Sequence, residues 1–231
     1  MEDMVRLPGG ALPELYFVDL DGTLLDTSSE RYFLSSLFRS RRLGSREMAR
    51  FLVSYMIHPA RTATEGKGWN RSYLKGLSLE TVESEAERCA AVLAEKNLRE
   101  WTLKSVNGMR ESRCRTVLLS ASLEPLAAAI ARRVPFDLIR ASRPEVTREK
   151  LTGLLEGARP WGKSKRTLMR EICDEYDANP ENCAAAGDSW ADRFILEECG
   201  CPVAVCPDRK LGKLARDRGW HIVEGRHTKW A

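Results

Sequence analysis

Four short apolar segments, each followed by polar residues and then by a helical pattern, constrain the fold of this chain more than any other feature. They lie at residues 15–18, 116–119, 183–186 and 202–205. Short, β-prone apolar runs of this kind are typical of buried strands. Strands that alternate with helices predict a parallel sheet with helices on both faces. Ligands of such sheets bind beyond the carboxyl ends of the strands, so we expect the functional site at that edge.

The region between the first two segments, residues 26–107, contains no strand-like run. Its apolar residues recur at helical spacing, which predicts an all-α insertion. They lie in three stretches, at residues 32–38, 48–55 and 79–101. In the second stretch one stripe is formed by Met48, Phe51, Leu52 and Tyr55, and the third stretch predicts one long helix. We therefore expect a helical cap domain at residues 26–107, inserted into a core of residues 1–25 and 108–231. Glycines within residues 140–161 also favour a small hairpin flap.

Composition describes an ordinary globular chain of 231 residues, with 43% hydrophobic and 30% charged residues. No apolar run approaches the ~20 residues that span a bilayer, and the first 14 residues, which we expect to form a loose tail, lack the apolar region of a signal peptide. Seven cysteines without a secretion signal favour reduced thiols and a cytoplasmic location. Cys199, Cys201 and Cys206 lack the partner pair of a zinc site. The net charge of +4 suits a small anionic substrate and does not call for nucleic acid.

The strongest chemical signal is Asp19-Leu20-Asp21-Gly22-Thr23, directly after the first apolar segment. Gly22 permits a sharp turn that can bring both carboxylates toward one site. Asp19 is the candidate nucleophile, because a carboxylate can attack phosphorus and form an aspartyl-phosphate. Asp21 is the candidate general acid and base for the leaving oxygen and the hydrolytic water. Taken alone, the same residues would also suit a plain Asp-Gly turn.

A second acidic cluster follows the third apolar segment. Asp188 and Asp192 are four residues apart where a helix is expected to begin, so they share one face. Carboxylate oxygens are the ligands that Mg²⁺ prefers, which predicts a magnesium site. The alternative for Asp192 is an exposed residue in the first turn of a helix.

Two further segments suggest a phosphate site. Ser120 ends the second apolar segment, and its hydroxyl can bind a phosphate oxygen, whereas Ser122 suits the N-cap of the helix that we expect near Leu123. A cation is also needed beside the phosphoryl oxygens. Lys165 shares the inner face of its predicted helix and is preferred, while Lys163 remains the alternative.

Together, these four clusters resemble the four motifs of the haloacid dehalogenase superfamily of phosphatases, and most closely its phosphoserine-phosphatase-like branch (subfamily IB). The resemblance covers the chain after residue 14 and implies a Rossmann-like core with a helical cap. It implies that Mg²⁺ is held by three groups: Asp19, the backbone carbonyl of Asp21, and Asp188. It also implies three supporting residues: Gly22, Thr23 and Asp192. Of these, Asp192 would support the metal ligands from behind or bind a water molecule on the metal.

The cap departs from the phosphoserine phosphatase pattern. Those enzymes carry a glutamate at the position of Ser28 and an arginine at the position that aligns with Gly76, with Glu30 close but out of register. We therefore expect phosphoserine to be a poor substrate. Arg31 and Arg71 are candidates for contact with the far end of the substrate, although each is more typical of a surface charge.

The sequence thus predicts a Mg²⁺-dependent phosphatase acting on a small-molecule phosphomonoester. One alternative is a phosphatase of lysophospholipids or other membrane-associated phosphate esters, because the cap is rich in arginine between residues 31 and 50, a pattern that otherwise marks a solvated face. A dehalogenase is disfavoured, because displacing halide needs no acid such as Asp21. A non-catalytic regulatory domain is disfavoured because no motif residue is missing. The oligomeric state is not predicted.

Overall fold

The structure, a computed structural model, describes residues 5–65 and 67–225. Its centre is a seven-stranded sheet in the order β4-β3-β2-β1-β5-β6-β7, in which only the edge pair β3–β4 is antiparallel. The strands are β1 (Leu15–Val18), β2 (Arg115–Leu123), β3 (Leu138–Thr147), β4 (Lys150–Glu156), β5 (Ala184–Gly187), β6 (Cys201–Val205) and β7 (His221–Val223). All four predicted strands are confirmed, while β7 and the parallel part of β3 were not foreseen.

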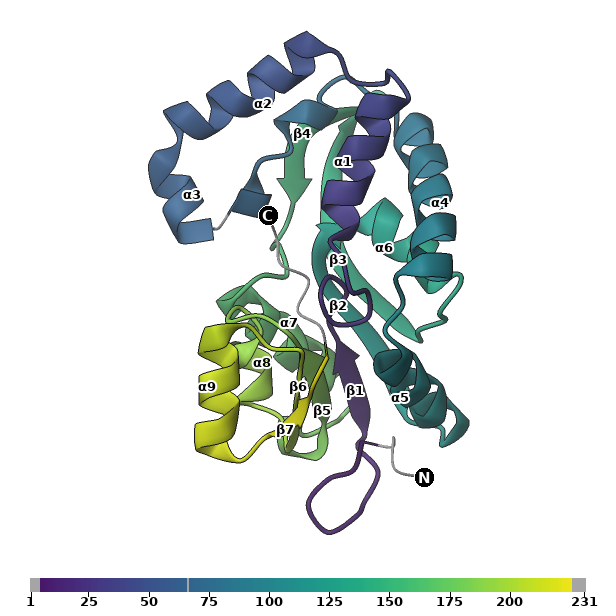
Figure 1. Cartoon of the computed structure of the whole chain (residues 1–231), viewed down its shortest axis with the longest axis vertical. Coiled ribbons are helices and arrows are strands. Elements are labelled where there is room, and N and C mark those ends of the chain that lie inside the picture. Colours follow the sequence, from purple (N-terminus) through teal and green to yellow (C-terminus); the bar gives the residue numbers. More distant parts are fainter. Residues whose placement is uncertain (1–4, 66, 226–231) are drawn as a thin grey trace.

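Helices cover both faces of the sheet, as the alternation of strands and helices predicts (Figure 1). Along β1, Tyr16 and Val18 join a hydrophobic cluster that includes side chains of α5 (Glu100–Glu111) and α6 (Glu124–Ala131). Leu15 and Phe17 point the other way, into a second cluster on the opposite face. That cluster contains side chains of α7 (Lys163–Glu175), α8 (Arg193–Leu196) and α9 (Arg209–Arg218). The chain therefore has an α/β, Rossmann-like core.

Within the described residues, the regular elements of the segment between β1 and β2 are all helices; α5 packs beside the sheet, and most of the others lie toward the top of the molecule in Figure 1. The elements of this segment, besides α5, are α1 (Ser29–Arg39), α2 (Ser45–Ile57), α3 (Pro59–Glu65), the 3₁₀ turns η1 (Lys67–Trp69) and η2 (Ser72–Leu74), and α4 (Leu79–Lys96). Buried side chains of α1 and α4, such as Phe33 and Leu93, belong to the same hydrophobic cluster as Tyr16 and Val18. This half of the helical segment is therefore packed directly on the core.

Two details of the predicted helices are wrong. The single helix expected over residues 79–101 is broken into α4 and α5, because the amide of Arg99 bonds the carbonyl oxygen of Leu24 at 2.9 Å and the side chain of Asn97 bonds that of Asp26 at 2.8 Å. These contacts attach the break to the segment after β1. In α2, Leu52 does not share the inner stripe but is 56% exposed.

The predicted hairpin flap is present as β3 and β4. The amide of Gly76 donates to the carbonyl oxygen of Leu151 at 2.9 Å, and the amide of Leu151 donates to that of Leu77 at 2.8 Å. The hairpin thereby joins the core sheet to the loop after η2. Across the described ranges, no helix has the length and apolarity needed to cross a membrane.

Candidate active site

A cavity of about 150 Å³ lies beyond the carboxyl ends of β1 and β5, against the end of β2 and below the helical segment. Its walls combine residues that the sequence suggested with others that it did not: Asp19, Asp21, Glu30, Ser120, Ala121, Ser122, Arg159, Trp161, Lys165, Ser189, Ala191 and Asp192. The cavity occupies the edge of the sheet at which parallel strands present their polar ends.

Asp19 and Lys165 meet at the floor of this cavity. The Lys165 ammonium donates to Oδ1 of Asp19 at 2.5 Å and to Oδ1 of Asp192 at 2.6 Å, and all three side chains are buried. Burial alone would lower the pKa of Lys165, but the two carboxylates outweigh it and the pKa is raised, so the lysine stays charged. Burial raises the pKa of Asp19 to about 7, although Lys165 opposes that rise. The lysine therefore holds a buried carboxylate at the end of β1.

Gly22 lets Asp188 approach this floor. A Cβ atom on Gly22 would lie 2.1 Å from Oδ2 of Asp188, and the backbone of Gly22 has φ +89°, a conformation that favours glycine. The hydroxyl of Thr23 donates to Oδ1 of Asp188 at 3.4 Å. The Asp-Gly-Thr segment after β1 thus makes room for a carboxylate from the end of β5 and orients it.

Three carboxylates converge at this point. Single oxygen atoms of Asp19, Asp188 and Asp192 lie within 4.8 Å of one another, and no other such cluster of potential metal ligands was found among residues 5–65 and 67–225. Burial raises the pKa of Asp188 well above its ordinary value, and repulsion from Asp192 and Asp19 raises it further. One lysine thus faces three crowded carboxylates, an excess of negative charge that a divalent cation would offset.

Asp192 already has partners for both of its oxygens. Besides Lys165 at Oδ1, its Oδ2 accepts from the amide of Ser189 at 3.0 Å and from the hydroxyl of Ser189 at 2.7 Å. These bonds also hold the loop after β5. The arrangement fits a supporting position for Asp192 better than an exposed first-turn residue.

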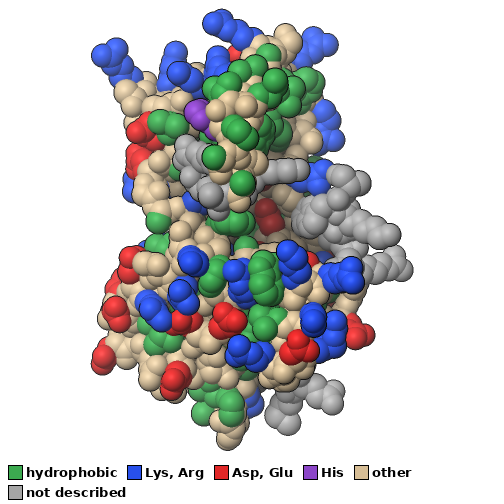
Figure 2. All heavy atoms as spheres, turned by 90° about the vertical axis from the view of Figure 1, so that its left-hand side faces the viewer, with side chains coloured by type: hydrophobic (Ala, Val, Ile, Leu, Met, Phe, Trp, Pro, Cys, Tyr) green, Lys and Arg blue, Asp and Glu red, His purple; other side chains and the backbone are tan. Residues whose placement is uncertain are grey.

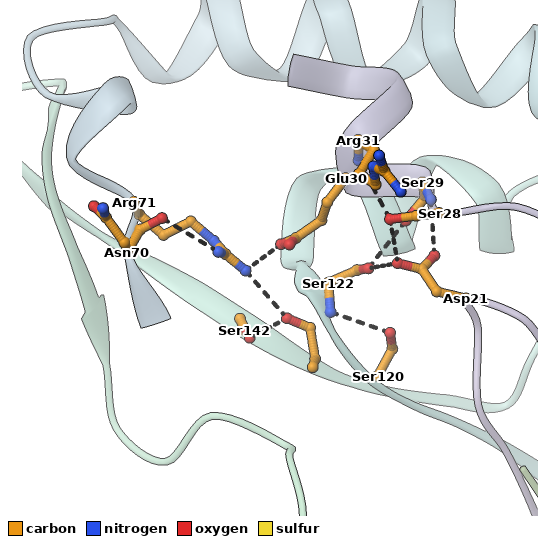
Figure 3. Close-up of polar contacts among 11 residues, drawn as sticks. Asp21, Ser28, Ser29, Glu30, Arg31, Asn70, Arg71, Ser120, Ser122 and Ser142 are labelled. Atoms are coloured by element: carbon orange, nitrogen blue, oxygen red, sulfur yellow. Dashed lines mark hydrogen bonds and ion pairs between the residues drawn. The ribbon is translucent and has the colours of Figure 1, made fainter. Parts of the chain in front are cut away.

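Asp21 sits in a ring of hydrogen-bond donors at the start of α1 (Figure 3). Its Oδ1 accepts from the amide of Ser29 at 2.9 Å, while Oδ2 accepts from the hydroxyls of Ser122 at 2.9 Å and Ser28 at 3.4 Å. Burial raises the pKa of Asp21, and the bonds from Ser29, Ser122 and Ser28 oppose the rise. A carboxyl group with a raised pKa retains its proton more readily, which suits a general acid.

Ser120 lies in the cavity wall, 1% exposed, but two expectations about this segment are wrong. The strand does not stop at Ser120, because β2 continues to Leu123. Ser122 does not cap a helix, since the N-cap of α6 is Leu123, without a side-chain hydrogen bond. Instead, the amide of Ser122 donates to Oγ of Ser120 at 3.1 Å, and its hydroxyl serves Asp21. Both serines therefore face the cavity.

The two lysines at the start of α7, Lys163 and Lys165, lie in different surroundings. Lys165 lies inside the cavity, whereas Lys163 is exposed and lines a different, larger hollow of about 800 Å³ with Trp161, Trp190 and Phe194. The geometry thus favours Lys165 as the cation beside Asp19.

Above the floor, Arg71, one of the two arginines that the sequence suggested for the far end of the substrate, forms an ion pair with Glu30, a pairing that the sequence did not predict (Figure 3). The guanidinium of Arg71 donates to Oε1 of Glu30, and Arg71 is 3% exposed rather than a surface charge. Burial raises the pKa of Glu30, and the charge of Arg71 opposes that rise. From Ser28 and Gly76 we inferred that charged groups are lacking around the far end of the substrate; the ion pair beside the cavity shows that this inference is wrong. Arg31, by contrast, is exposed.

Two more cavity residues lie on the connection between β4 and α7, which carries no motif. The guanidinium of Arg159 lies 5.6 Å from the ring centre of Trp161. It also reaches the helical segment, because a Cβ atom on Gly68 would lie 2.1 Å from Nη2 of Arg159. No sequence signal identified either residue.

Residues 16–197 match the sequence profile of the haloacid dehalogenase-like hydrolases. "Phosphoserine phosphatase SerB1" of Mycobacterium tuberculosis H37Rv is 28% identical over 236 residues, which cover 98% of this chain and 75% of that protein. "Protein CicA" of Caulobacter vibrioides is 26% identical over 219 residues, covering 94% and 90% of the two chains.

Solved structures show the same fold at lower identity. A crystal structure of a protein "with unknown function" from Bordetella pertussis Tohama I superposes with a TM-score of 0.78 at 23% identity, covering 93% of this chain and 99% of that one. A substrate-bound phosphoserine phosphatase complex superposes with a TM-score of 0.65 at 20% identity, covering 93% and 94%. These similarities establish the architecture.

Proposed function

The chain belongs to the haloacid dehalogenase-like hydrolase family as a phosphoserine-phosphatase-like phosphatase, and from that membership we propose that it hydrolyses a small-molecule phosphomonoester with Mg²⁺ through an aspartyl-phosphate. The observation that carries the proposal is the buried contact of Lys165 with both Asp19 and Asp192, next to Asp188. A nucleophile held beside a cation and an acidic cluster is what phosphoryl transfer needs.

In the first step, an oxygen of Asp19 forms a bond to phosphorus and the bond between phosphorus and the ester oxygen breaks. Asp21 gives its proton to the departing oxygen, which leaves as an alcohol. In the second step, Asp21 takes a proton from water, the water oxygen attacks phosphorus, and the bond to Asp19 breaks with release of phosphate. Ser120 and Lys165 bind the phosphoryl oxygens throughout.

The donor set fits Mg²⁺, since its carboxylates are hard oxygen ligands and their charges are only partly balanced by Lys165. Asp19, the backbone carbonyl of Asp21, and Asp188 would hold the ion, with Asp192 behind them. When bound, Mg²⁺ supplies positive charge that lets an anionic nucleophile approach an anionic phosphate.

We propose that residues 26–107 act as a specificity cap on a core of residues 1–25 and 108–231. Glu30 and Arg71 lie in or beside the cavity as one carboxylate and one guanidinium. A substrate with an ammonium and a carboxylate at its far end could exchange charge partners with both, as a phosphorylated amino acid can. This replaces the expectation that phosphoserine is a poor substrate, because its premise, the lack of charged groups, does not hold.

The test is hydrolysis by the wild-type protein of a panel that contains p-nitrophenyl phosphate, phosphoserine, phosphoethanolamine, glycerol 2-phosphate and a lysophosphatidic acid. We expect turnover with Mg²⁺, none with excess EDTA, and recovery when Mg²⁺ is restored. Phosphoserine should have a higher kcat/KM than phosphoethanolamine, which lacks the carboxylate. Turnover that is unaffected by EDTA would exclude the metal mechanism, and a lead for lysophosphatidic acid would favour the membrane-associated alternative.

A further inference from the structure

Helix α2 is unusual because it is apolar on two sides. Its inner side, with Phe51 and Tyr55, packs on aromatic side chains: Phe51 lies 5.2 Å from Tyr73 and Tyr55 lies 5.8 Å from Trp69, centre to centre. An ordinary surface helix would present polar residues on its other side. Although α2 has this inner contact, none of its residues is fully buried.

The outer side of α2 carries large apolar side chains instead. Leu52 is 56% exposed, Val53 49%, Met56 78% and Ile57 63%. These residues, with the exposed Ala49, recur at helical spacing and form one continuous stripe. Figure 2 shows hydrophobic side chains gathered on the part of the molecule that carries α2, with Lys and Arg side chains around them. Exposed apolar patches of this kind usually mark an interaction surface.

Positive charge surrounds the stripe. Between residues 39 and 57 the chain has five arginines and a single acidic residue, Glu47. Oε2 of Glu47 accepts from the amide of Gly44 at 3.0 Å, so this carboxylate serves the start of the helix. The segment carries 5 − 1 = +4, which equals the formal net charge of the whole chain. On the helix, Arg50 lies about one turn before Val53, and Arg46 lies about two turns before it, on the same side.

We propose that the outer face of α2, defined by Leu52, Val53, Met56 and Ile57 with the surrounding arginines, docks on an anionic phospholipid surface. An apolar stripe bordered by arginine is the pattern of a helix that lies in the membrane interface, with its apolar side among the acyl chains and its basic side at the headgroups. A second copy of the chain fits less well, because a two-fold contact through this face would oppose two +4 segments.

The docked helix is connected to the cavity through its inner side. The side-chain amide of Asn70 donates to the carbonyl oxygen of Phe51 at 2.9 Å, and the next residue is Arg71 of the ion pair with Glu30. Docking would therefore hold against the membrane the helix that contacts the segment bearing Arg71. The docking itself does not depend on the proposed activity.

The test is sedimentation of the 231-residue chain with vesicles of phosphatidylcholine alone or with roughly one-third phosphatidylglycerol. We expect binding to the anionic vesicles only, with loss of binding when salt is raised to about 0.5 M. Arg42→Gln/Arg46→Gln should weaken binding roughly 30-fold, at about 1 kcal/mol for each charge. Leu52→Ser/Met56→Ser should weaken vesicle binding about ten-fold or more, since two apolar side chains that would enter the membrane are lost.

Matched controls sit on other faces. Leu154→Ser removes an apolar side chain that is 55% exposed on β4, and Arg209→Gln/Lys213→Gln removes two charges from α9. Both controls should bind anionic vesicles like wild type, and all four variants should hydrolyse p-nitrophenyl phosphate normally in the absence of vesicles. The proposal is overturned if anionic vesicles do not bind the wild-type protein, if the controls weaken binding as much as the α2 variants, or if the α2 variants instead dissociate a dimer.

Discussion

The floor of the cavity, formed by Asp19, Asp188, Asp192 and Lys165, and its roof, formed by Glu30 and Arg71, are built in opposite ways. The floor brings Asp19 and Asp188 together because each follows one of two neighbouring strands, β1 and β5, which pair in register. Lys165, from the first turn of α7, binds the floor carboxylates directly. The roof has one ion pair, between Glu30 of α1 and Arg71 before η2, whose members are 41 residues apart. Sheet pairing fixes the floor, whereas the packing of the helical segment fixes the roof.

Under the proposed function, this difference predicts a separation of chemistry from selectivity. In the proposed mechanism, groups on the floor act on the phosphoryl group, which every phosphomonoester shares, so a change there should lower activity toward all substrates alike. Groups on the roof can contact only the remainder of the substrate, so a change there should alter the ranking of substrates. Variants of the two regions can test this separation directly.

The largest effect is expected for Asp19→Asn. An amide cannot form the aspartyl-phosphate, so kcat should fall on the order of 10⁴-fold or more for every substrate. The fold should persist, because Lys165 keeps its contact with Asp192. Steady-state assays on p-nitrophenyl phosphate and phosphoserine, with circular dichroism as the folding control, measure both outcomes. Normal turnover by this variant would remove Asp19 from the mechanism.

The next largest effect is expected for Lys165→Met, with Lys163→Met as its matched control. Loss of the buried cation that contacts Asp19 should lower kcat on the order of 10³-fold. Lys163 is exposed, so its replacement should leave kcat within about two-fold. The two variants are compared on the same two substrates. An inactive Lys163→Met beside a nearly normal Lys165→Met would reverse the assignment.

A smaller effect, visible mainly in the metal dependence, is expected for Asp188→Asn. The variant keeps the shape of the side chain but removes one negative charge from the proposed Mg²⁺ site, so about 100-fold more Mg²⁺ should be needed for half-maximal activity. Titration of the EDTA-treated protein with MgCl₂ measures the shift. An unchanged Mg²⁺ requirement would place the metal away from Asp188.

The floor could be foreseen from the sequence because its signals are local. The runs at residues 15–18 and 116–119 are followed directly by Asp19 and Ser120, and the run at 183–186 is followed by Asp188 after one glycine. Parallel pairing brings such ends to one edge of the sheet. The same reasoning failed for Ser122, because a serine after a strand suits a helix cap equally well, and only the continuation of β2 to Leu123 decides between them. Strand β7 was missed because three residues carry no periodic signal of their own.

The sequence suggested Arg71 as a candidate, but the pairing of Arg71 with Glu30 could not be foreseen because it depends on contacts between distant segments. Neither Glu30 nor Arg71 belongs to a motif, and counting residues from Asp19 pointed to Ser28 instead. The break between α4 and α5 has a similar origin, since it depends on bonds to Leu24 and Asp26 near β1. Helical periodicity continues through such a break, so the sequence alone predicted one helix.

The smallest and most selective effect is expected for Arg71→Met. Without the guanidinium, phosphoserine loses a partner for its carboxylate, and kcat/KM for phosphoserine should fall roughly 30-fold or more, about 2 kcal/mol. Turnover of p-nitrophenyl phosphate, which lacks that group, should stay within about three-fold. Arg31→Met is the matched control, because Arg31 is a neighbouring but exposed arginine, and it should change neither substrate.

Stability must be separated from selectivity in this variant, because Arg71→Met leaves the partly buried carboxyl of Glu30 without its guanidinium. Burial already raises the pKa of Glu30, and Arg71 opposes that rise, so its removal should favour the neutral acid. The double variant Glu30→Gln/Arg71→Met removes the lone charge and should melt at a higher temperature than Arg71→Met alone. It should nevertheless retain the defect toward phosphoserine. Equal losses for phosphoserine and p-nitrophenyl phosphate would show that the roof acts on the phosphoryl chemistry, and the separation of the two regions would fail.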